Sequence, residues 1–185
     1  MATNIREKHV VFVGFMGVGK TTVGQLVAKA LSRDFIDTDQ VIEERFQKSV
    51  PQIFQELGEQ RFREAEKETI VEICQESPGK VIALGGGAYL NEDIRRACQE
   101  YGIVIHLDLS WDHWCRRMEQ LQGNRPLLQN KTLHDIEKLF QSRQAYYEMG
   151  STSVCVDGLT PEEVTERVVG LLQKMWNEKD QEGSC

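Results

Sequence analysis

The sequence predicts an α/β protein, a three-layer α/β/α sandwich built on a five-stranded parallel sheet. Short runs rich in β-branched residues alternate with longer segments of helical periodicity along the chain. Each strand is therefore followed by a segment long enough to cross over the sheet, which makes neighbouring strands parallel and places helices on both faces. No internal repeat or low-complexity linker divides the 185 residues, a length that suits one domain.

The first half of the chain begins with an apolar run that ends at Gly14, which is typical of a buried strand. The segments predicted in this half are strands at 10–13 and 35–36 and helices at 19–32, 40–46, 51–57 and 59–75. We expect Asp39 to cap the second of these helices, the one containing Val41 and Ile42, and Gly58 to separate the last two helices.

The second half continues the same alternation, with Asn91, Ser110 and Thr160 as predicted helix caps. The segments predicted here are strands at 81–84, 103–107 and 153–156, helices at 91–100, 111–121, 132–148 and 161–176, and a loop at 122–131. We therefore expect a single domain over 1–176, with a lid loop near 122–131, and a disordered polar tail over 177–185.

Composition excludes several classes of function. The net charge of −7 argues against sequence-independent binding of nucleic acid, which needs a basic surface. Residues 1–8 lack the apolar run of a secretion signal, and no segment is apolar enough to span a membrane. The five cysteines contain no C-x-x-C pair and are odd in number, so we expect reduced thiols and a cytoplasmic protein.

The segment Gly14–Thr21 fits the pattern G-x-x-x-x-G-K-[ST] and lies between a predicted strand and a predicted helix, the context that this phosphate-binding loop requires. Its glycines permit backbone N–H groups to approach phosphate oxygens, and the helix N-terminus adds a positive dipole end. Lys20 is expected to reach the β- and γ-phosphates of ATP, and Thr21 to bind Mg²⁺. The sequence therefore predicts an ATP-dependent phosphotransferase with a P-loop kinase fold.

Two carboxylates follow the second strand as Asp37-Thr38-Asp39. In a parallel sheet, the segments after the strands meet at one edge, where ligands bind. Asp37 is expected to hold the Mg²⁺ shell through water, and Asp39 to accept a proton from the hydroxyl group of the acceptor. The alternative for Asp39 is a purely structural helix cap.

Three consecutive glycines, Gly85, Gly86 and Gly87, follow the predicted strand 81–84. Bare backbone at this position is expected where a substrate or phosphate lies against the chain, although a tight turn between strand and helix is an alternative. Arg63, Arg125 and Arg143 are further candidates for anion binding. The residues alone do not select these three from the other arginines of the chain, which include Arg61, Arg95, Arg96, Arg116 and Arg117.

Taken together, the sequence resembles the shikimate kinase family over about residues 9–172. Six motifs carry the resemblance, in family order and spacing: the phosphate-binding loop, the segment 35–39, the segment 53–63, Gly85-Gly86-Gly87-Ala88, Arg125-Pro126-Leu127-Leu128, and Arg143 before Tyr146-Tyr147. The resemblance implies transfer of the γ-phosphoryl group of ATP to the 3-hydroxyl group of shikimate, with one Mg²⁺ per subunit, in a monomer. A gluconate kinase on the same fold is the alternative, but it is expected to lack the glycine triplet and the placed arginines.

The resemblance also implies roles for individual residues. The catalytic residues implied are Lys20, Asp39 and Arg125, the last as a lid arginine over the phosphates. The ATP-binding residues implied are Gly14, Met16, Gly17, Val18, Gly19, Lys20, Thr21, Thr22, Arg116 and Arg125. The shikimate-binding residues implied are Asp39, Arg63, Gly85, Gly86, Gly87 and Arg143, and the metal partners are Thr21 and Asp37. The chain departs from the family at 157–160, a loop in which several members carry an arginine near adenine.

Overall fold

The computed structural model describes residues 4–120 and 132–182, and a five-stranded parallel sheet forms its centre. The strands are β1 (His9–Val13), β2 (Phe35–Asp37), β3 (Val81–Ala83), β4 (Gly102–Asp108) and β5 (Thr152–Cys155), in the spatial order β2-β3-β1-β4-β5. Ala83 pairs with both Phe12 and Asp37, so β1, β2 and β3 end level with one another. The segments that follow these strands therefore meet at one edge of the sheet.

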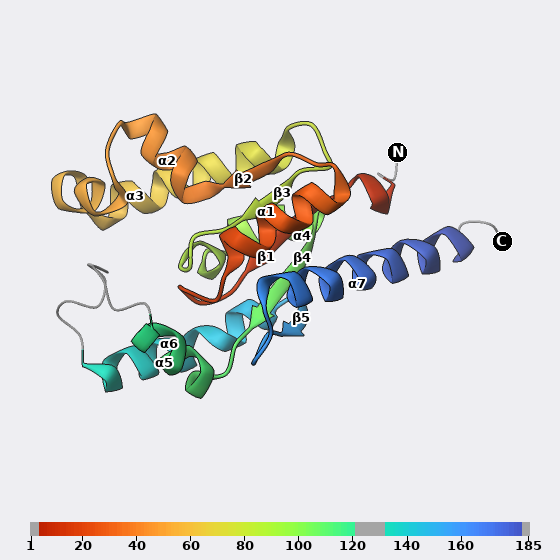
Figure 1. Ribbon diagram of the computed structural model, residues 1–185. Helices are drawn as coiled ribbons and strands as arrows, with labels where there is room; N and C mark the ends of the chain where they lie inside the picture. The colour runs from red at the N-terminus through yellow and green to blue at the C-terminus, as the bar shows by residue number, and fades with distance from the viewer. Residues whose placement is uncertain (1–3, 121–131, 183–185) are drawn as a thin grey trace.

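The helices pack on both faces of the sheet, which confirms the predicted three-layer architecture (Figure 1). They are α1 (Lys20–Leu31), α2 (Thr38–Phe46), α3 (Val50–Gln75), α4 (Glu92–Tyr101), α5 (Trp111–Gln120), α6 (Leu133–Glu148) and α7 (Pro161–Glu182), with short 3₁₀ turns at Ile5–Glu7 and Ala88–Leu90. Helix α1 packs against α7, and α3 packs against α4. Within the described ranges, no helix combines the length and apolar character needed to cross a membrane.

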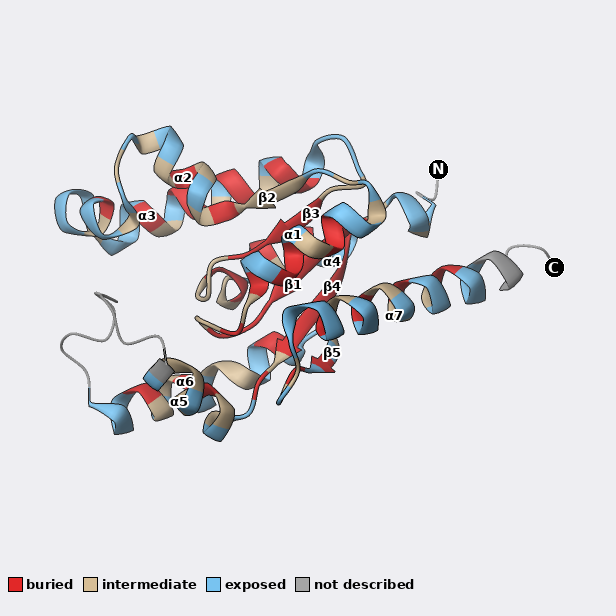
Figure 2. Ribbon diagram, in the orientation of Figure 1, coloured by how far each residue is buried: buried red, intermediate tan, exposed pale blue. Residues whose placement is uncertain are grey.

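The main hydrophobic core lies along the central strands (Figure 2). Every residue of β1 is buried, because that strand has a neighbouring strand on each side and helices on both faces. A second, smaller core joins α2 to α3 through the buried side chains of Ile42, Ile53 and Phe62. The α2–α3 unit thus has apolar packing of its own, separate from the core that supports the first strand and α1.

Three local features differ from the sequence-based expectation or refine it. Asp37, and not Asp39, caps α2: its carboxylate accepts hydrogen bonds from the N–H groups of Asp39, at 3.1 Å, and Gln40, at 3.5 Å. Gly58 interrupts α3 as predicted, with a φ of 81° that a helix cannot contain. Helix α7 continues through 177–182, where a disordered tail was expected.

Two contacts account for the longer α7. The indole of Trp176 packs into the main core, and the side-chain oxygen of Asn177 accepts a hydrogen bond of 3.1 Å from Arg6. Lys174 and Glu178 also form an i,i+4 ion pair on the exposed side of the helix. An i,i+4 ion pair contributes a few tenths of a kcal/mol, about enough to extend a helix that is already anchored by packing.

Candidate active site

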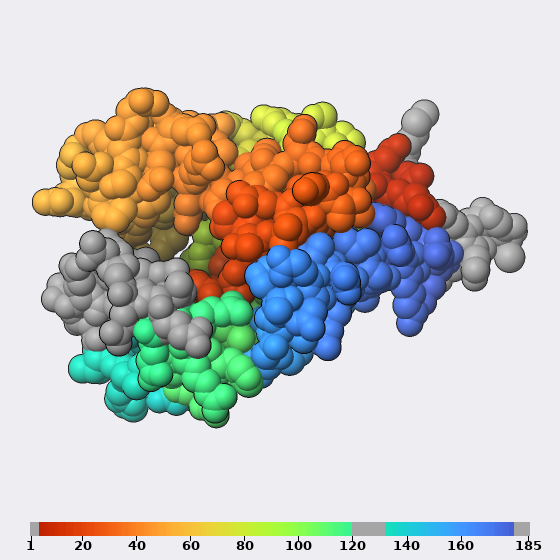
Figure 3. Space-filling view, in the orientation of Figure 1, coloured from red at the N-terminus to blue at the C-terminus, as the bar shows by residue number. Residues whose placement is uncertain are grey.

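A cavity of about 590 Å³ opens at the edge of the sheet where β1, β2 and β3 end. Figure 3 shows the surface hollowed there, between the orange segment that contains α2 and α3 and the green segment that contains α5. The lining includes most of the predicted ATP-binding residues, namely Met16, Gly17, Val18, Gly19, Lys20, Thr21 and Thr22. It also includes the predicted metal partner Asp37 and three of the predicted acceptor-binding residues, Asp39, Gly85 and Gly86. The parallel sheet therefore gathers segments that are far apart in the sequence.

The loop between β1 and α1 has the backbone of a phosphate-binding loop. Gly14, Gly17 and Gly19 have φ values of 144°, 79° and 99°, in the region that other residues rarely adopt. Gly19 is the N-cap of α1, and no side-chain capping hydrogen bond is made to the N–H groups of the first turn. The N-terminus of the helix is thus open toward the cavity, an arrangement that favours an anion.

Lys20 is buried at the start of α1, and its Nζ atom donates to the carbonyl oxygens of Gly14, at 2.7 Å, and Phe15, at 3.0 Å. Burial lowers the pKa of the Lys20 ammonium to about 8, although the carboxylates of Asp39 and Asp37 act in the opposite direction. A buried ammonium group that is bonded only to neutral carbonyl oxygens is strongly stabilised when a polyanion binds beside it. The side chain is therefore suited to bind phosphate.

Thr21 and Asp37 supply adjacent oxygen atoms below the loop. The Thr21 hydroxyl donates to Oδ2 of Asp37 at 2.7 Å, while Oδ1 of the same carboxylate caps α2. Hard oxygen donors of this kind suit Mg²⁺, which retains several waters and needs few protein ligands. No group of three His, Cys, Asp or Glu side chains that could hold a metal by itself occurs in residues 4–120 or 132–182. The pair therefore fits a divalent cation that arrives with a nucleotide.

Asp39 lines the cavity beside the glycine triplet. A side chain at Gly85 would place its Cβ atom 2.5 Å from Oδ1 of Asp39, so only glycine allows the carboxylate and the turn to approach so closely. Burial raises the pKa of the Asp39 carboxyl, and the negative charge of Asp37 adds to this shift while Lys20 opposes it. Because Asp37 caps α2, the carboxylate of Asp39 is not used in the cap and is available to a ligand.

Arg63 projects from α3 toward the same turn. Its guanidinium forms an ion pair of 2.7 Å with the buried carboxylate of Glu66 and lies 5.3 Å from the ring centre of Phe62. A Cβ atom on Gly87 would come within 3.0 Å of the guanidinium nitrogens. Burial raises the pKa of the Glu66 carboxyl, and the hydrogen bond from Arg63 opposes that shift. Sequence reasoning missed Glu66, whose only signal was its position one helical turn after Arg63.

Arg143 reaches the turn from α6 on the other side. Its Nη1 atom donates to the carbonyl oxygen of Gly86 at 3.3 Å, and its guanidinium carbon lies 5.8 Å from the centre of the Phe15 ring. The Nε atom is buried without a hydrogen-bond partner among the described residues. Tyr147, one turn further along α6, also donates from its hydroxyl to the Gly86 carbonyl, and burial raises its pKa to about 12. Two side chains of α6 thus hold the turn at the Gly86 carbonyl.

We call Asp39, Arg63, Gly85–Gly87 and Arg143 the acceptor side, and residues 14–22 the nucleotide side. The two meet where Gly86 lies against the backbone of Met16, since a Cβ atom at Gly86 would be 3.3 Å from the Met16 nitrogen. Arg63, Gly87 and Arg143 do not line the 590 Å³ cavity itself; Arg63 lies beside Gly87, and Arg143 is bonded to the carbonyl oxygen of Gly86, which does line it. The structure therefore brings the predicted acceptor residues together around one turn.

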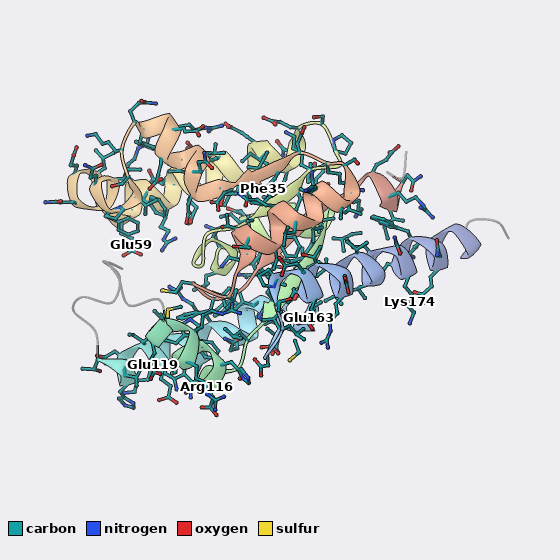
Figure 4. The ribbon with its side chains drawn as sticks, in the orientation of Figure 1. Phe35, Glu59, Arg116, Glu119, Glu163 and Lys174 are labelled. Atoms are coloured by element: carbon teal, nitrogen blue, oxygen red, sulfur yellow. The ribbon has the colours of Figure 1, made fainter. Side chains whose placement is uncertain are left out.

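The predicted Arg116 does not line the cavity. Arg116 is exposed on α5 and lies at the lower margin of the molecule in Figure 4, away from the phosphate-binding loop. The next residue, Arg117, lines the cavity instead and donates to the carbonyl oxygen of Val18 at 2.9 Å. One residue along a helix rotates a side chain by about 100°, which accounts for the difference. Arg125 lies outside the described residues.

The far end of the cavity is apolar. Leu159 and Pro161, from the loop after β5 and the start of α7, line it together with Val156 and Val164. This loop is the one in which the sequence lacks an arginine. The cavity therefore has a polar end at the phosphate-binding loop and an apolar end suited to a flat base.

Comparisons with known proteins give a consistent result. The family model described as "Shikimate kinase" matches residues 16–173. A "Shikimate kinase" of Bacillus subtilis (strain 168) is 47% identical over 176 residues, which cover 95% of each chain. A solved structure of shikimate kinase from Acinetobacter baumannii in complex with shikimate has a TM-score of 0.81 and 28% identity, and covers 92% of this chain and 95% of its own. A gluconokinase from Sinorhizobium meliloti has a TM-score of 0.59 at 18% identity, with 96% and 98% covered, a likeness of fold alone.

Proposed function

The chain belongs to the shikimate kinase family, and we propose how its residues divide the transfer of the γ-phosphoryl group of ATP to the 3-hydroxyl group of shikimate. The observation that carries the proposal is the position of Asp39, which faces both Lys20 and the glycine turn in one cavity. A proton acceptor and a phosphate-binding cation at one point are the two groups that phosphoryl transfer to an alcohol requires.

On the nucleotide side, the N–H groups of residues 14–22 and the N-terminus of α1 bind the phosphates, and Lys20 stabilises the charge on the transferring group. Thr21 and Asp37 hold one Mg²⁺, which neutralises charge on the phosphate oxygens when it is bound. Arg117 and Leu159 contact the base, with Arg117 in the role that the resemblance gave to Arg116. Arg125 closes over the phosphates, as the resemblance implies.

On the acceptor side, Asp39 accepts the proton of the attacking hydroxyl group. Burial raises the pKa of its carboxyl, which makes the carboxylate a better proton acceptor than an exposed aspartate. Arg63 and Arg143 bind the carboxylate of shikimate from α3 and α6, because a planar guanidinium pairs with a carboxylate through two parallel hydrogen bonds. The glycine turn lets the ring lie directly against the backbone.

We further propose that the protein acts as a monomer in the cytoplasm, without nucleic acid or membrane partners. The net charge of −7 supports the expected lack of nucleic-acid and membrane partners, since a surface of that sign repels nucleic acid and anionic lipid.

A coupled ADP-release assay with Mg²⁺ and ATP tests the choice of acceptor. We expect turnover with shikimate and only background ADP release with gluconate, which has no ring to lie against the turn. Equal rates with the two acceptors would contradict the assignment of Arg63, Arg143 and the glycine turn to shikimate.

A further inference from the structure

Helix α5 supports the phosphate-binding loop through a buried indole. The Nε1–H group of Trp114 donates to the carbonyl oxygen of Met16 at 2.8 Å. Trp114 is 1% exposed and does not line the cavity, so it has no access to a bound nucleotide. The bond joins two residues that are 98 positions apart in the sequence.

The hydrogen bond from Trp114 to the Met16 carbonyl also fixes the direction of the Gly17 N–H group. A trans peptide is planar, and its C=O and N–H groups point in opposite directions. The carbonyl oxygen of Met16 points to the indole, so the N–H group of Gly17 points away from it. Gly17 lines the cavity, and its N–H group donates to no backbone carbonyl within the described residues. The indole therefore holds the peptide in the orientation that presents this N–H group to a phosphate.

The peptide needs an anchor because the chain is free to rotate there. Gly17 has a φ of 79°, and glycine populates negative and positive φ with similar ease. A rotation of the 16–17 peptide would turn the carbonyl oxygen toward the phosphate, which replaces attraction with repulsion. Arg117 holds the next two peptides of the loop, through hydrogen bonds of 3.4 Å to the carbonyl oxygen of Gly17 and 2.9 Å to that of Val18.

Aromatic packing fixes the indole itself. The Trp114 ring meets Phe15 edge to face, with ring centres 5.6 Å apart, and stacks on Trp111 at 5.1 Å with an interplanar angle of 11°. Phe15 also packs edge to face on Phe140 of α6, at 5.1 Å. A ring held on several sides keeps one rotamer, so its N–H group is already aimed before any ligand arrives.

We propose that Trp114 is a positioning residue for the nucleotide: it orients the Gly17 N–H group and so raises the affinity for ATP without touching it. The inference rests on the proposed function, because it assumes that the loop binds the phosphates of ATP. It predicts an effect on nucleotide binding that is separate from any effect on shikimate.

The test compares Trp114→Phe with Trp176→Phe. Both changes remove a buried indole, but the Trp176 nitrogen, on α7, has no hydrogen-bond partner among the described residues. We expect Trp114→Phe to raise the KM for ATP about 3- to 10-fold, the value of one hydrogen bond, and to leave the KM for shikimate within about twofold. Trp176→Phe should change neither constant, although both variants lose thermal stability.

An unchanged KM for ATP in folded Trp114→Phe, or an equal rise in Trp176→Phe, would overturn the proposal. A parent protein that binds no ADP would instead overturn the proposed function. If Trp114→Phe fails to fold, the proposal is tested by NMR of the indole N–H groups of the parent protein. Trp111→Phe and Trp176→Phe are used to assign the signals. The Trp114 signal should shift on addition of ADP while the Trp176 signal stays in place; no shift of the Trp114 signal would contradict the proposal.

Discussion

The nucleotide side and the acceptor side bind their ligands with different parts of the chain. Residues 14–22 form one continuous segment and offer mainly backbone N–H groups, held by the main core beneath β1 and α1. The acceptor side takes single side chains from α2, α3 and α6 and arranges them around the turn after β3. Backbone donors survive almost any side-chain change, whereas each distributed side chain is exposed to loss by a single substitution.

This difference predicts which kinetic constant each substitution changes. Substitutions on the nucleotide side should change the KM for ATP and kcat. Substitutions of the acceptor-side residues that bind shikimate should change the KM for shikimate. The largest effects test whether the two sides have separate roles, and the smaller effects test which side chains keep the glycine turn in position.

Lys20→Ala should have the largest effect. It removes the one side-chain charge that the nucleotide side places on the transferring phosphoryl group, and we expect kcat to fall about 1,000-fold or more. The measurement is coupled ADP release, with Lys29→Ala as the control, an exposed lysine near the other end of α1. Normal turnover in Lys20→Ala would remove this lysine from the mechanism.

Arg125→Ala should act mainly on kcat, with a decrease of about 100- to 1,000-fold, because a lid arginine stabilises charge that develops only in the transition state. Steady-state kinetics with both substrates varied separates this effect from binding. A change confined to the KM for shikimate would place Arg125 on the acceptor side instead.

Arg143→Ala should raise the KM for shikimate about 10- to 100-fold, since it removes charged hydrogen bonds to a carboxylate. The matched control is Arg96→Ala, an arginine on α4 whose side chain is 72% exposed and which does not contact the turn. An unchanged KM for shikimate would show that Arg143 is only a structural partner of Gly86.

The pH dependence of nucleotide binding should follow Lys20. Burial lowers its pKa from 10.5 to about 8, so the empty protein holds the charge below pH 8 and loses it as the pH rises. ATP binding then requires proton uptake, and the KM for ATP should increase by up to about tenfold per pH unit above 8. The KM for shikimate serves as the internal control; a KM for ATP that stays flat across this range would contradict the assigned pKa.

Tyr147→Phe should have the smallest effect. Its hydroxyl shares the Gly86 carbonyl with Arg143, so its loss loosens the turn without freeing it, and the KM for shikimate should rise about threefold. Tyr89→Phe is the control, because that buried hydroxyl also donates to a backbone carbonyl, of Met149, at 2.7 Å. Equal shifts in the two variants would indicate general destabilisation.

Sequence reasoning succeeded where the determinants are contiguous. The P-loop, the alternation of strands and helices along the chain and the break at Gly58 each follow from a local pattern, and the structure contains all three. The neighbouring aspartates were harder, because either Asp37 or Asp39 has the chemistry of a cap. Only the backbone conformation places Asp37 at the N-cap position of α2 and turns Asp39 toward Gly85.

The distributed contacts did not follow from local patterns. Nothing in the sequence alone distinguishes Arg63 and Arg143 from the other arginines, and only the resemblance selected them. The shift from Arg116 to Arg117 depends on the rotation of α5 about its axis, and the bond from Trp114 to Met16 depends on how that helix packs against the loop. These are properties of tertiary packing.

The most direct test of the two-sided site is calorimetric titration of Arg143→Ala with ADP and, separately, with shikimate. We expect ADP to bind with an affinity within about twofold of the parent, while shikimate binding weakens about 10-fold or more. A loss of ADP affinity as large as the loss of shikimate affinity would contradict the separation of the two sides.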